Sequence, residues 1–166
     1  MATMDNLQDA FAGESQANRK YLAFAAKAEK DGYPQVAKLF RAAADAETVH
    51  AHAHLRVMDG IQDTADNLEV AIEGEGFEFQ EMYPGYLAEA EAEGNRRAAY
   101  SFKNALAVEE IHHDLYQEAL ASVKAGSDLP EAKIFVCGVC GNTVYGAPPD
   151  KCPVCGVAHT RFSEIA

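Results

Sequence analysis

Two copies of a Glu-x-x-His motif constrain this chain more than any other feature. Glu47-Thr-Val-His50 and Glu109-Glu-Ile-His112 both lie in segments with helical periodicity. Residues three apart on a helix share a face, so each motif presents a carboxylate and an imidazole to one ion. Each histidine also follows a glycine, Gly32 or Gly94, by 18 residues. The motifs therefore occupy equivalent places in a repeated helical hairpin.

The apolar periodicity predicts a mainly α chain. Helical segments are expected at about 7–30, 35–58, 66–93 and 96–124. Short turns at 31–34 and 94–95 join them into two antiparallel hairpins. The connection near 59–66 is short for the crossover between the hairpins. The expected architecture is a ferritin-like four-helix bundle.

The two remaining helical segments also carry a carboxylate on their apolar faces. Glu14 lies between Phe11 and Tyr21, and Glu75 follows Ile72. Burying unpaired carboxylates together is costly, and a bound cation removes that cost. Single glutamates on two helices and Glu-x-x-His on two others are the ligands of di-iron and di-manganese bundles. Iron or manganese suits them, with zinc possible. The alternative is a chance pattern of solvated surface glutamates.

Two details of the ligand set are open to another interpretation. Glu110 and His113 form a further Glu-x-x-His pair, although the repeat favours Glu109 and His112. Tyr21 and Tyr83 can hydrogen-bond a ligand carboxylate or simply pack in the core. The other histidines of the helical segments are expected beside the ligands or at the surface: His52, His54 and His113.

The third helical segment contains one residue more than the first. Glu14 precedes Gly32 by 18 residues, whereas Glu75 precedes Gly94 by 19. One extra residue predicts a π-bulge, a feature that often marks a functional site. We expect Glu78 to be a fifth carboxylate that moves on and off a metal. The alternative is an ordinary surface glutamate.

All four cysteines lie near the C-terminus, in two C-x-x-C-G knuckles. They are Cys137 and Cys140, then Cys152 and Cys155. Four thiolates at this spacing predict a tetrahedral site for zinc or a single iron. Zinc would be structural, whereas iron would transfer electrons. We expect a helical bundle at 1–125, a linker at 126–133 and a metal-stapled β module at 134–166.

Charge and hydropathy exclude other classes of function. The formal net charge is −12 without a basic cluster, which argues against binding nucleic acid or an anionic membrane surface. No apolar run approaches the roughly 20 residues of a membrane span. Residues 1–8 lack the basic and apolar regions of a secretory signal. The expected location is the cytoplasm.

Several segments together resemble the rubrerythrin family. They are Ala10-Phe-Ala-Gly-Glu14-Ser-Gln-Ala-Asn18, Glu78-Phe-Gln-Glu-Met-Tyr-Pro84, Ala107-Val-Glu109-Glu-Ile-His112 and the paired knuckles. The resemblance implies seven ligands for two irons: Glu14, Glu47, His50, Glu75, Glu78, Glu109 and His112. It makes the C-terminal module rubredoxin-like, with Cys137, Cys140, Cys152 and Cys155 holding one iron. It also implies that Glu78 exchanges with His50 on one iron, and that Tyr21 and Tyr83 stand beside the ligands.

The resemblance also implies an activity and partners. Rubrerythrins reduce hydrogen peroxide to water in oxidative-stress defence. Electrons reach the di-iron site through the FeS4 centre, ultimately from NAD(P)H by way of separate reductases or small redox proteins. Members are usually homodimers, and the short crossover permits helix exchange between chains. The rival functions are a ferritin-like ferroxidase and a non-catalytic metal-binding module with a structural zinc ribbon.

Overall fold

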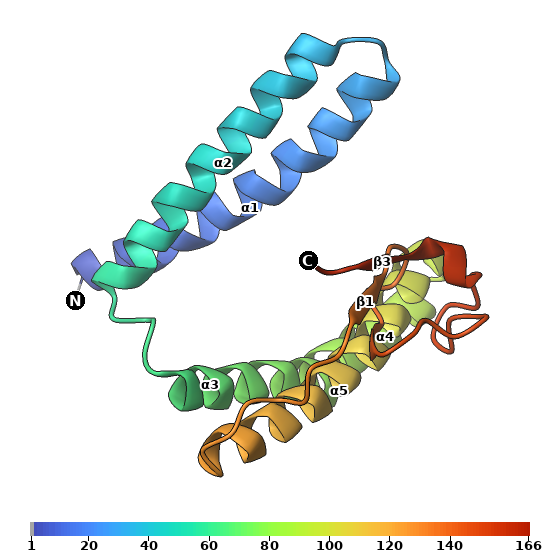
Figure 1. Ribbon diagram of the computed structural model, residues 1–166. Helices are drawn as coiled ribbons and strands as arrows, with labels where there is room; N and C mark the ends of the chain where they lie inside the picture. The colour runs from blue at the N-terminus through green and yellow to red at the C-terminus, as the bar shows by residue number, and fades with distance from the viewer. Residues whose placement is uncertain (1) are drawn as a thin grey trace. The chain divides into compact units, whose positions relative to one another are not determined.

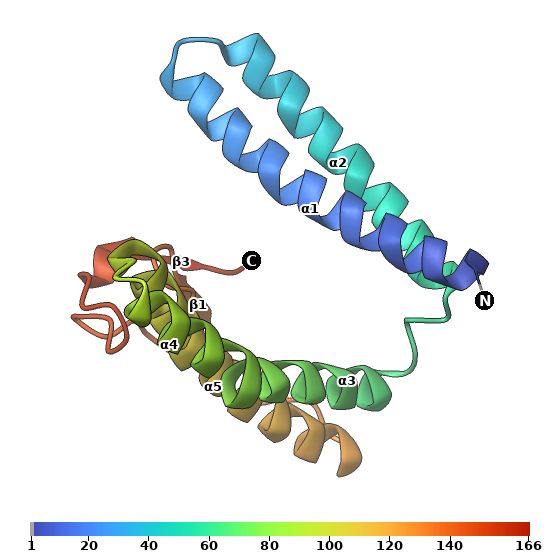
Figure 2. The same cartoon turned by 180° about the vertical axis from the view of Figure 1, so that it is seen from behind.

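The computed structural model describes residues 2–166 and contains two compact units (Figures 1 and 2). One unit extends to Gln62 and the other is Asp63–Ala166. The first contains α1 (Ala2–Lys30) and α2 (Pro34–Val57). The second contains α3 (Thr64–Phe77), the π-helix η1 (Glu78–Met82), α4 (Tyr83–Ala92), α5 (Arg96–Lys124), β1 (Ile134–Cys137), β2 (Thr143–Tyr145), the 3₁₀ helix η2 (His159–Arg161) and β3 (Phe162–Glu164).

Local turn chemistry makes α1 and α2 an antiparallel hairpin (Figure 1). Gly32 adopts a φ of +83°, a conformation that costs little only for glycine. The N–H of Tyr33 donates to the carbonyl of Ala28 at 2.9 Å, which closes the end of α1. Pro34 then starts α2, where its fixed φ suits the first helical turn.

Small side chains hold the two helices of this hairpin together. Ala25, Ala28 and Ala37 are buried between them, with Phe40 packed alongside. A polar clamp adds to this contact. The buried Asn18 side chain donates through Nδ2 to the carbonyl of Ala44 at 2.7 Å and to Thr48 Oγ1 at 2.8 Å. The clamp sits one helical turn from Glu14, so it positions that carboxylate against α2.

The second hairpin packs the α3–η1–α4 arm against α5. Asp63 caps α3 by accepting from the N–H of Asp66 at 3.0 Å. Asn95 caps α5 by accepting from the N–H of Ala98 at 3.1 Å. Both caps satisfy backbone donors that a helix N-terminus leaves unpaired.

The π-bulge predicted from the repeat is confirmed as η1. After the bulge, equivalent residues of the hairpins are 62 apart, as in Tyr21 and Tyr83. Before it they are 61 apart, as in Glu14 and Glu75. The inserted residue therefore lies between Glu75 and Tyr83, where η1 is found.

Each hairpin carries the same cluster of three aromatic rings. The ring centroids of Tyr21, Phe24 and Phe40 are 6.3, 6.2 and 5.6 Å apart. Those of the equivalent residues are 6.3, 6.1 and 5.6 Å apart, in Tyr83, Tyr86 and Phe102. The repeat read from the sequence thus extends to matching side-chain packing.

The C-terminal module is a small antiparallel sheet with strand order β2-β1-β3. Phe135 of β1 pairs with Val144 of β2 and with Glu164 of β3. After α5 the chain turns back along that helix before entering β1 (Figures 1 and 2). Leu129 of this return segment lines a cavity with Leu115 and Ala119 of α5. The segment therefore ties the module to the helix that precedes it.

The fold class predicted from the sequence is confirmed. The chain has two helical hairpins followed by a β module with a four-cysteine site. Within residues 2–166, no helix combines the length and apolar character needed to cross a membrane.

Two glycines of the first hairpin give a test of its turn. Gly32→Ala places a Cβ at φ +83° and should lower the free energy of unfolding by about 1 kcal/mol. Gly13→Ala, in the interior of α1 with open space around its Cβ, should raise it by about 0.5–1 kcal/mol. Urea unfolding followed by far-UV circular dichroism measures both. If both substitutions changed the free energy of unfolding equally and in the same direction, the result would contradict the positive φ of Gly32.

Candidate metal centre

One group of potential ligands lies on the α1–α2 hairpin. His50 Nδ1 is 3.1 Å from Glu47 Oε2 and 3.7 Å from Glu14 Oε2. The ligand atoms of these three residues all lie within 4.8 Å of one another. Helical spacing brings Glu47 and His50 onto one face of α2, and α1 supplies Glu14 across the hairpin.

The second hairpin carries a group with nearly the same geometry. His112 Nδ1 is 2.9 Å from Glu109 Oε2 and 3.7 Å from Glu75 Oε1. These ligand atoms also lie within 4.8 Å of one another. We call the two groups the Glu14–Glu47–His50 triad and the Glu75–Glu109–His112 triad. Six of the seven residues expected to bind the two irons thus form two triads, one in each helical hairpin.

The carboxylates of each triad are electrostatically unfavourable as neighbours. A hydrogen bond with Glu47 raises the pKa of Glu14, and the same bond lowers the pKa of Glu47, so Glu14 is the member of the pair that binds a proton more readily. Burial, then the charge of Glu109, raises the pKa of Glu75. A cation between the carboxylates would replace the proton and remove the repulsion. Carboxylate and imidazole donors in this arrangement fit iron.

Glu78, the seventh expected ligand, stands beside the Glu75–Glu109–His112 triad at the start of η1. Burial and the charge of Glu75 raise its pKa. Burial, followed by the charges of Glu78, Glu109 and Glu75, also raises the pKa of Tyr83. Tyr83 therefore lies within the electrostatic reach of these carboxylates and keeps its phenolic proton. Tyr21 packs against Phe24 and Phe40.

The rival register on α5 places its histidine elsewhere. The ring of His113 packs against Phe79 of η1 at a centroid distance of 5.2 Å. Its Nε2 faces the side-chain amide of Gln117 at 3.3 Å. Glu110 is exposed. The structure therefore brings Glu109 and His112, not Glu110 and His113, to the carboxylate of Glu75.

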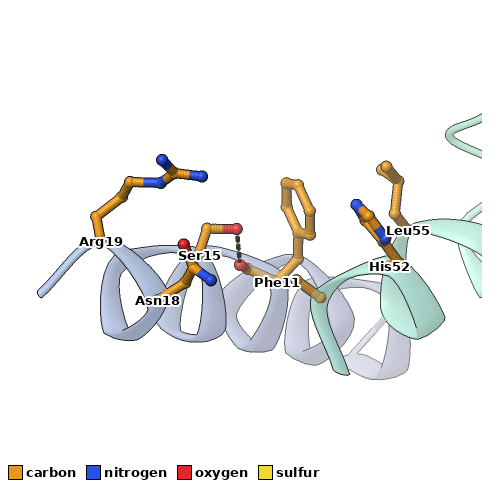
Figure 3. A pocket seen from close by; sticks show the side chains of 7 residues that line it. Phe11, Ser15, Asn18, Arg19, His52 and Leu55 are labelled. Carbon is orange, nitrogen blue, oxygen red and sulfur yellow. Dashed lines mark hydrogen bonds between the residues drawn. The ribbon is translucent and has the colours of Figure 1, made fainter. Parts of the chain in front are cut away.

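His52 lies two residues beyond His50 and so points to a different side of α2. It lines a cavity of about 210 Å³ with Ser15, Asn18 and Arg19 (Figure 3). Phe11, Ala51 and Leu55 complete the lining, so the residues around this cavity include no carboxylate. The cavity lacks the donor set of the triads, and His52 is a suitable control residue.

The four cysteines converge on one point of the module. Sγ of Cys137 is 3.8 Å from that of Cys155, and Sγ of Cys140 is 3.5 Å from that of Cys152. A tetrahedron with metal–sulfur bonds of about 2.3 Å has edges of about 3.8 Å. These separations therefore fit a bound metal and are far longer than a disulfide bond.

Backbone donors prepare the thiols of this site for a metal. Burial alone would raise the pKa of Cys152, but hydrogen bonds from the N–H groups of Cys155 and Val154 lower it to about 7. Burial raises the pKa of Cys140, so its thiol keeps a proton that a bound metal would displace.

The cysteine site contacts the helix that carries the second triad. A cavity of about 340 Å³ is lined by Cys140 and Gly141 of one knuckle and by Glu109 and His112 of α5. His112 Nε2 also lies 3.0 Å from Oγ1 of Thr143, the first residue of β2. The two candidate metal sites of this unit therefore adjoin each other within one chain.

Comparisons with known proteins agree with this arrangement. The rubrerythrin family model matches residues 5–120, and the model of the rubredoxin-like domain of rubrerythrin matches residues 135–163. The chain belongs to the rubrerythrin family. Rubrerythrin-2 of Clostridium acetobutylicum is 36% identical over 98% of this chain and 96% of its own length. Rubrerythrin of Porphyromonas gingivalis is 35% identical over 98% of this chain and 90% of its own.

The chain is also similar to solved structures of nigerythrin. Nigerythrin in its fully reduced, all-ferrous state is 32% identical, with a TM-score of 0.58. The alignment covers 98% of this chain and 86% of nigerythrin. Nigerythrin of Nitratidesulfovibrio vulgaris is also 33% identical in sequence. The family is one of iron-binding oxidoreductases, and the triads and the cysteine site supply donors that suit iron.

Sequence reasoning missed two residues next to the second triad of this rubrerythrin-family chain. Thr143 reaches His112 from the β module. Burial, then the charges of Glu75 and Glu109, raises the pKa of Tyr116, which places its phenol near the same carboxylates. Neither belongs to a motif, so no signal in the sequence distinguished them from core or surface residues.

The raised pKa values of these carboxyls predict an unusual pH dependence of stability. Raised pKa values at Glu14, Glu75 and Glu78 stabilise the folded protein below the ordinary glutamate value of 4.5. That stability is lost as the pH rises through the raised values, while the lowered pKa of Glu47 acts in the opposite direction. The Tm of metal-free protein should therefore fall as the pH rises above about 4.5.

Added Co²⁺ should restore the lost stability at about pH 8. It should do little at about pH 5, because protons then compete with the metal for the carboxylates. At a Co²⁺ concentration 100 times its Kd, the free energy of unfolding should rise by about 2.7 kcal/mol. Glu75→Gln should flatten the pH dependence and reduce the gain, whereas the exposed Glu73→Gln should change neither. Differential scanning calorimetry measures the Tm, and a pH-independent Tm for the wild type would refute the argument.

Proposed function

We propose that this protein is a non-haem di-iron peroxidase that reduces hydrogen peroxide to water. The observation that carries the proposal is the pair of matched triads, one of which is hydrogen-bonded to the β module that contains the cysteine site. Iron storage needs no electron supply, so the attached cysteine site favours a reductase over a ferroxidase. A cytoplasmic role in oxidative-stress defence is consistent with this chemistry.

The residues of the triads and Glu78 would hold two irons, which supply Lewis acidity and two electrons for cleavage of the O–O bond. Reduction of one peroxide to two waters also consumes two protons. Tyr83 keeps its phenolic proton beside Glu78, so it can orient a carboxylate by donating a hydrogen bond. Glu78 favours protonation, so when it is off the metal it can hold a proton near the reacting atoms.

The cysteine site would hold one iron and pass single electrons to the centre. It would receive them from a reductase or small redox protein that draws on NAD(P)H. A structural zinc in this site would leave the helical centre without that supply. Zinc gives a colourless site and iron a red one, so the visible spectrum of the purified protein separates the two.

Peroxide reactivity tests the proposed activity directly. Under anaerobic conditions, the iron-loaded protein is reduced, freed of reductant and mixed with hydrogen peroxide. Return of the FeS4 absorption should be fast in the wild type. Glu47→Ala and His112→Ala should slow it by at least about 100-fold, because each removes a ligand.

His52→Ala is the matched control, because His52 faces the cavity of Figure 3 rather than a triad. It should react at the wild-type rate. If the iron-loaded wild type ignored peroxide but oxidised excess ferrous iron with oxygen, the protein would be a ferroxidase instead.

We also propose that the working unit is a homodimer in which helical hairpins are exchanged. Six residues, 58–63, join α2 to α3. Fully extended, they bridge at most about 25 Å between Val57 and Thr64. The true reach is shorter, because the N–H of Gly60 still donates to the carbonyl of Leu55 at 2.9 Å.

A ferritin-like bundle needs a longer connection. Its single long crossover joins two parallel helices with the metals between their middles. Glu47 lies about 15 Å before the end of α2, and Glu75 lies about 17 Å after the start of α3. A crossover past the metals must therefore span roughly 32 Å, which exceeds the reach of six residues. Pairing with the hairpins of a second copy removes this conflict.

The apolar residues on the carboxylate face of each hairpin support such pairing. Tyr21 lies seven residues from Glu14, and Phe40 seven from Glu47, so they share a face with the ligands. In the aromatic clusters, Phe24 and Tyr86 are each 47% exposed. Packing one hairpin on another would bury both clusters and complete the centre.

Mixing two inactive variants tests the exchange. A Glu47→Ala chain and a Glu109→Ala chain, with different affinity tags, are co-expressed and their heterodimer is purified. In an exchanged dimer, the two intact hairpins meet in one site, which should restore about half of the wild-type peroxide reactivity. If each centre is built within one chain, every site carries a defect and the heterodimer stays as inactive as either variant.

A further inference from the structure

The imidazole of His112 is held from both sides. Its Nδ1 faces Glu109 and Glu75, at 2.9 and 3.7 Å. Its Nε2 lies 3.0 Å from Thr143 Oγ1, and the Thr143 hydroxyl donates to the carbonyl of Gly141 at 3.1 Å. When Nδ1 binds a metal, the ring proton must sit on Nε2. The Thr143 hydroxyl oxygen can then accept a hydrogen bond from Nε2–H of His112, while the hydroxyl proton is donated to the carbonyl of Gly141.

The segment 141–143 is anchored to the cysteine site. Gly141 directly follows Cys140 and approaches the side chain of Val108 on α5. Asn142 is buried, its carbonyl accepts from the N–H of Cys137 at 2.9 Å, and its Nδ2 lies 3.7 Å from Cys152 Sγ. Thr143 therefore continues a rigid stretch of chain that begins at the cysteine knuckle.

The two triads differ in this respect. The side chain of His112 is 26% exposed, whereas that of His50, in the other triad, is 56% exposed. The distances from each Nδ1 to its carboxylates are otherwise alike. The hydrogen bond from the β module is thus a feature that distinguishes the imidazoles of two similar triads.

We propose that Thr143 is a positioning residue that fixes the orientation and tautomer of His112 and joins the cysteine module to the triad of its own chain. A hydrogen-bond partner on the far nitrogen of a metal-bound histidine raises metal affinity by about 10–100-fold. The Glu75–Glu109–His112 triad therefore binds metal more tightly than the Glu14–Glu47–His50 triad. This triad is also the part of the proposed di-iron centre that contacts the module containing the cysteine site.

The test compares Thr143→Val with Thr143→Ser in the full chain, with zinc in the cysteine site. Valine keeps the shape and strand preference of threonine but removes the hydroxyl, whereas serine keeps the hydroxyl. Titration with Co²⁺ should show a 10–100-fold weaker affinity at one of two binding steps for the valine variant. The serine variant should bind Co²⁺ as the wild type does.

Imidazole NMR supplies a second readout. In ¹⁵N-labelled wild-type and Thr143→Ser protein with diamagnetic Zn²⁺ bound, His112 should show a slowly exchanging Nε2–H resonance that is absent from Thr143→Val. Equal Co²⁺ binding and an unchanged resonance in the valine variant would overturn the proposal. If all variants keep the same far-UV circular dichroism, a loss of affinity cannot be assigned to unfolding.

The coupling to the cysteine site rests on the proposed peroxidase function and has its own measurement. With iron in every site, peroxide should reoxidise the FeS4 centre at least 10-fold more slowly in Thr143→Val than in Thr143→Ser. The Co²⁺ titration and the NMR experiment need no peroxide. A protein that proved not to be a peroxidase would therefore still confirm or refute the positioning role.

Discussion

Each hairpin holds two carboxylates close enough to repel each other. Glu14 meets Glu47 on one hairpin, and Glu75 meets Glu109 on the other. Such pairs persist only when a proton or a cation lies between them. Packing within each hairpin is therefore arranged to hold the acids together. The Asn18 clamp does so between α1 and α2, and the caps at Asp63 and Asn95 define where α3 and α5 begin.

The two hairpins share one arrangement of helices, ligands and aromatic rings, and they differ in two features near the second triad. Their aromatic clusters agree to within 0.1 Å in ring separation. Against that background the inserted residue of η1 stands out, because it displaces Glu78 and Tyr83 relative to a regular helix. A π-helix widens the local turn and changes which side chains face the ligands. The second difference is the β module, which reaches His112 through Thr143.

Charge couples metal binding to proton release in both the cysteine site and the triads. The thiol of Cys140 and the carboxyl of Glu75 both favour protons until a cation arrives. Metal loading of either site therefore releases protons and stiffens its surroundings. Because the module contacts α5 through residues 141–143, the proposed role of Thr143 would link order in the cysteine site to the imidazole of His112.

The local features follow from the sequence alone: two helical hairpins, the π-bulge, the Glu-x-x-His faces and the cysteine knuckles. Helical spacing and turn chemistry act over a few residues, so Glu109 with His112, and Gly32 before Pro34, could be read directly. The packing of separate elements places Thr143 against His112 and His113 on Phe79. It also brings Tyr116 within electrostatic reach of the carboxylates. Those contacts depend on how separate elements pack, and no periodicity or motif encodes the meeting of residues 31 positions apart.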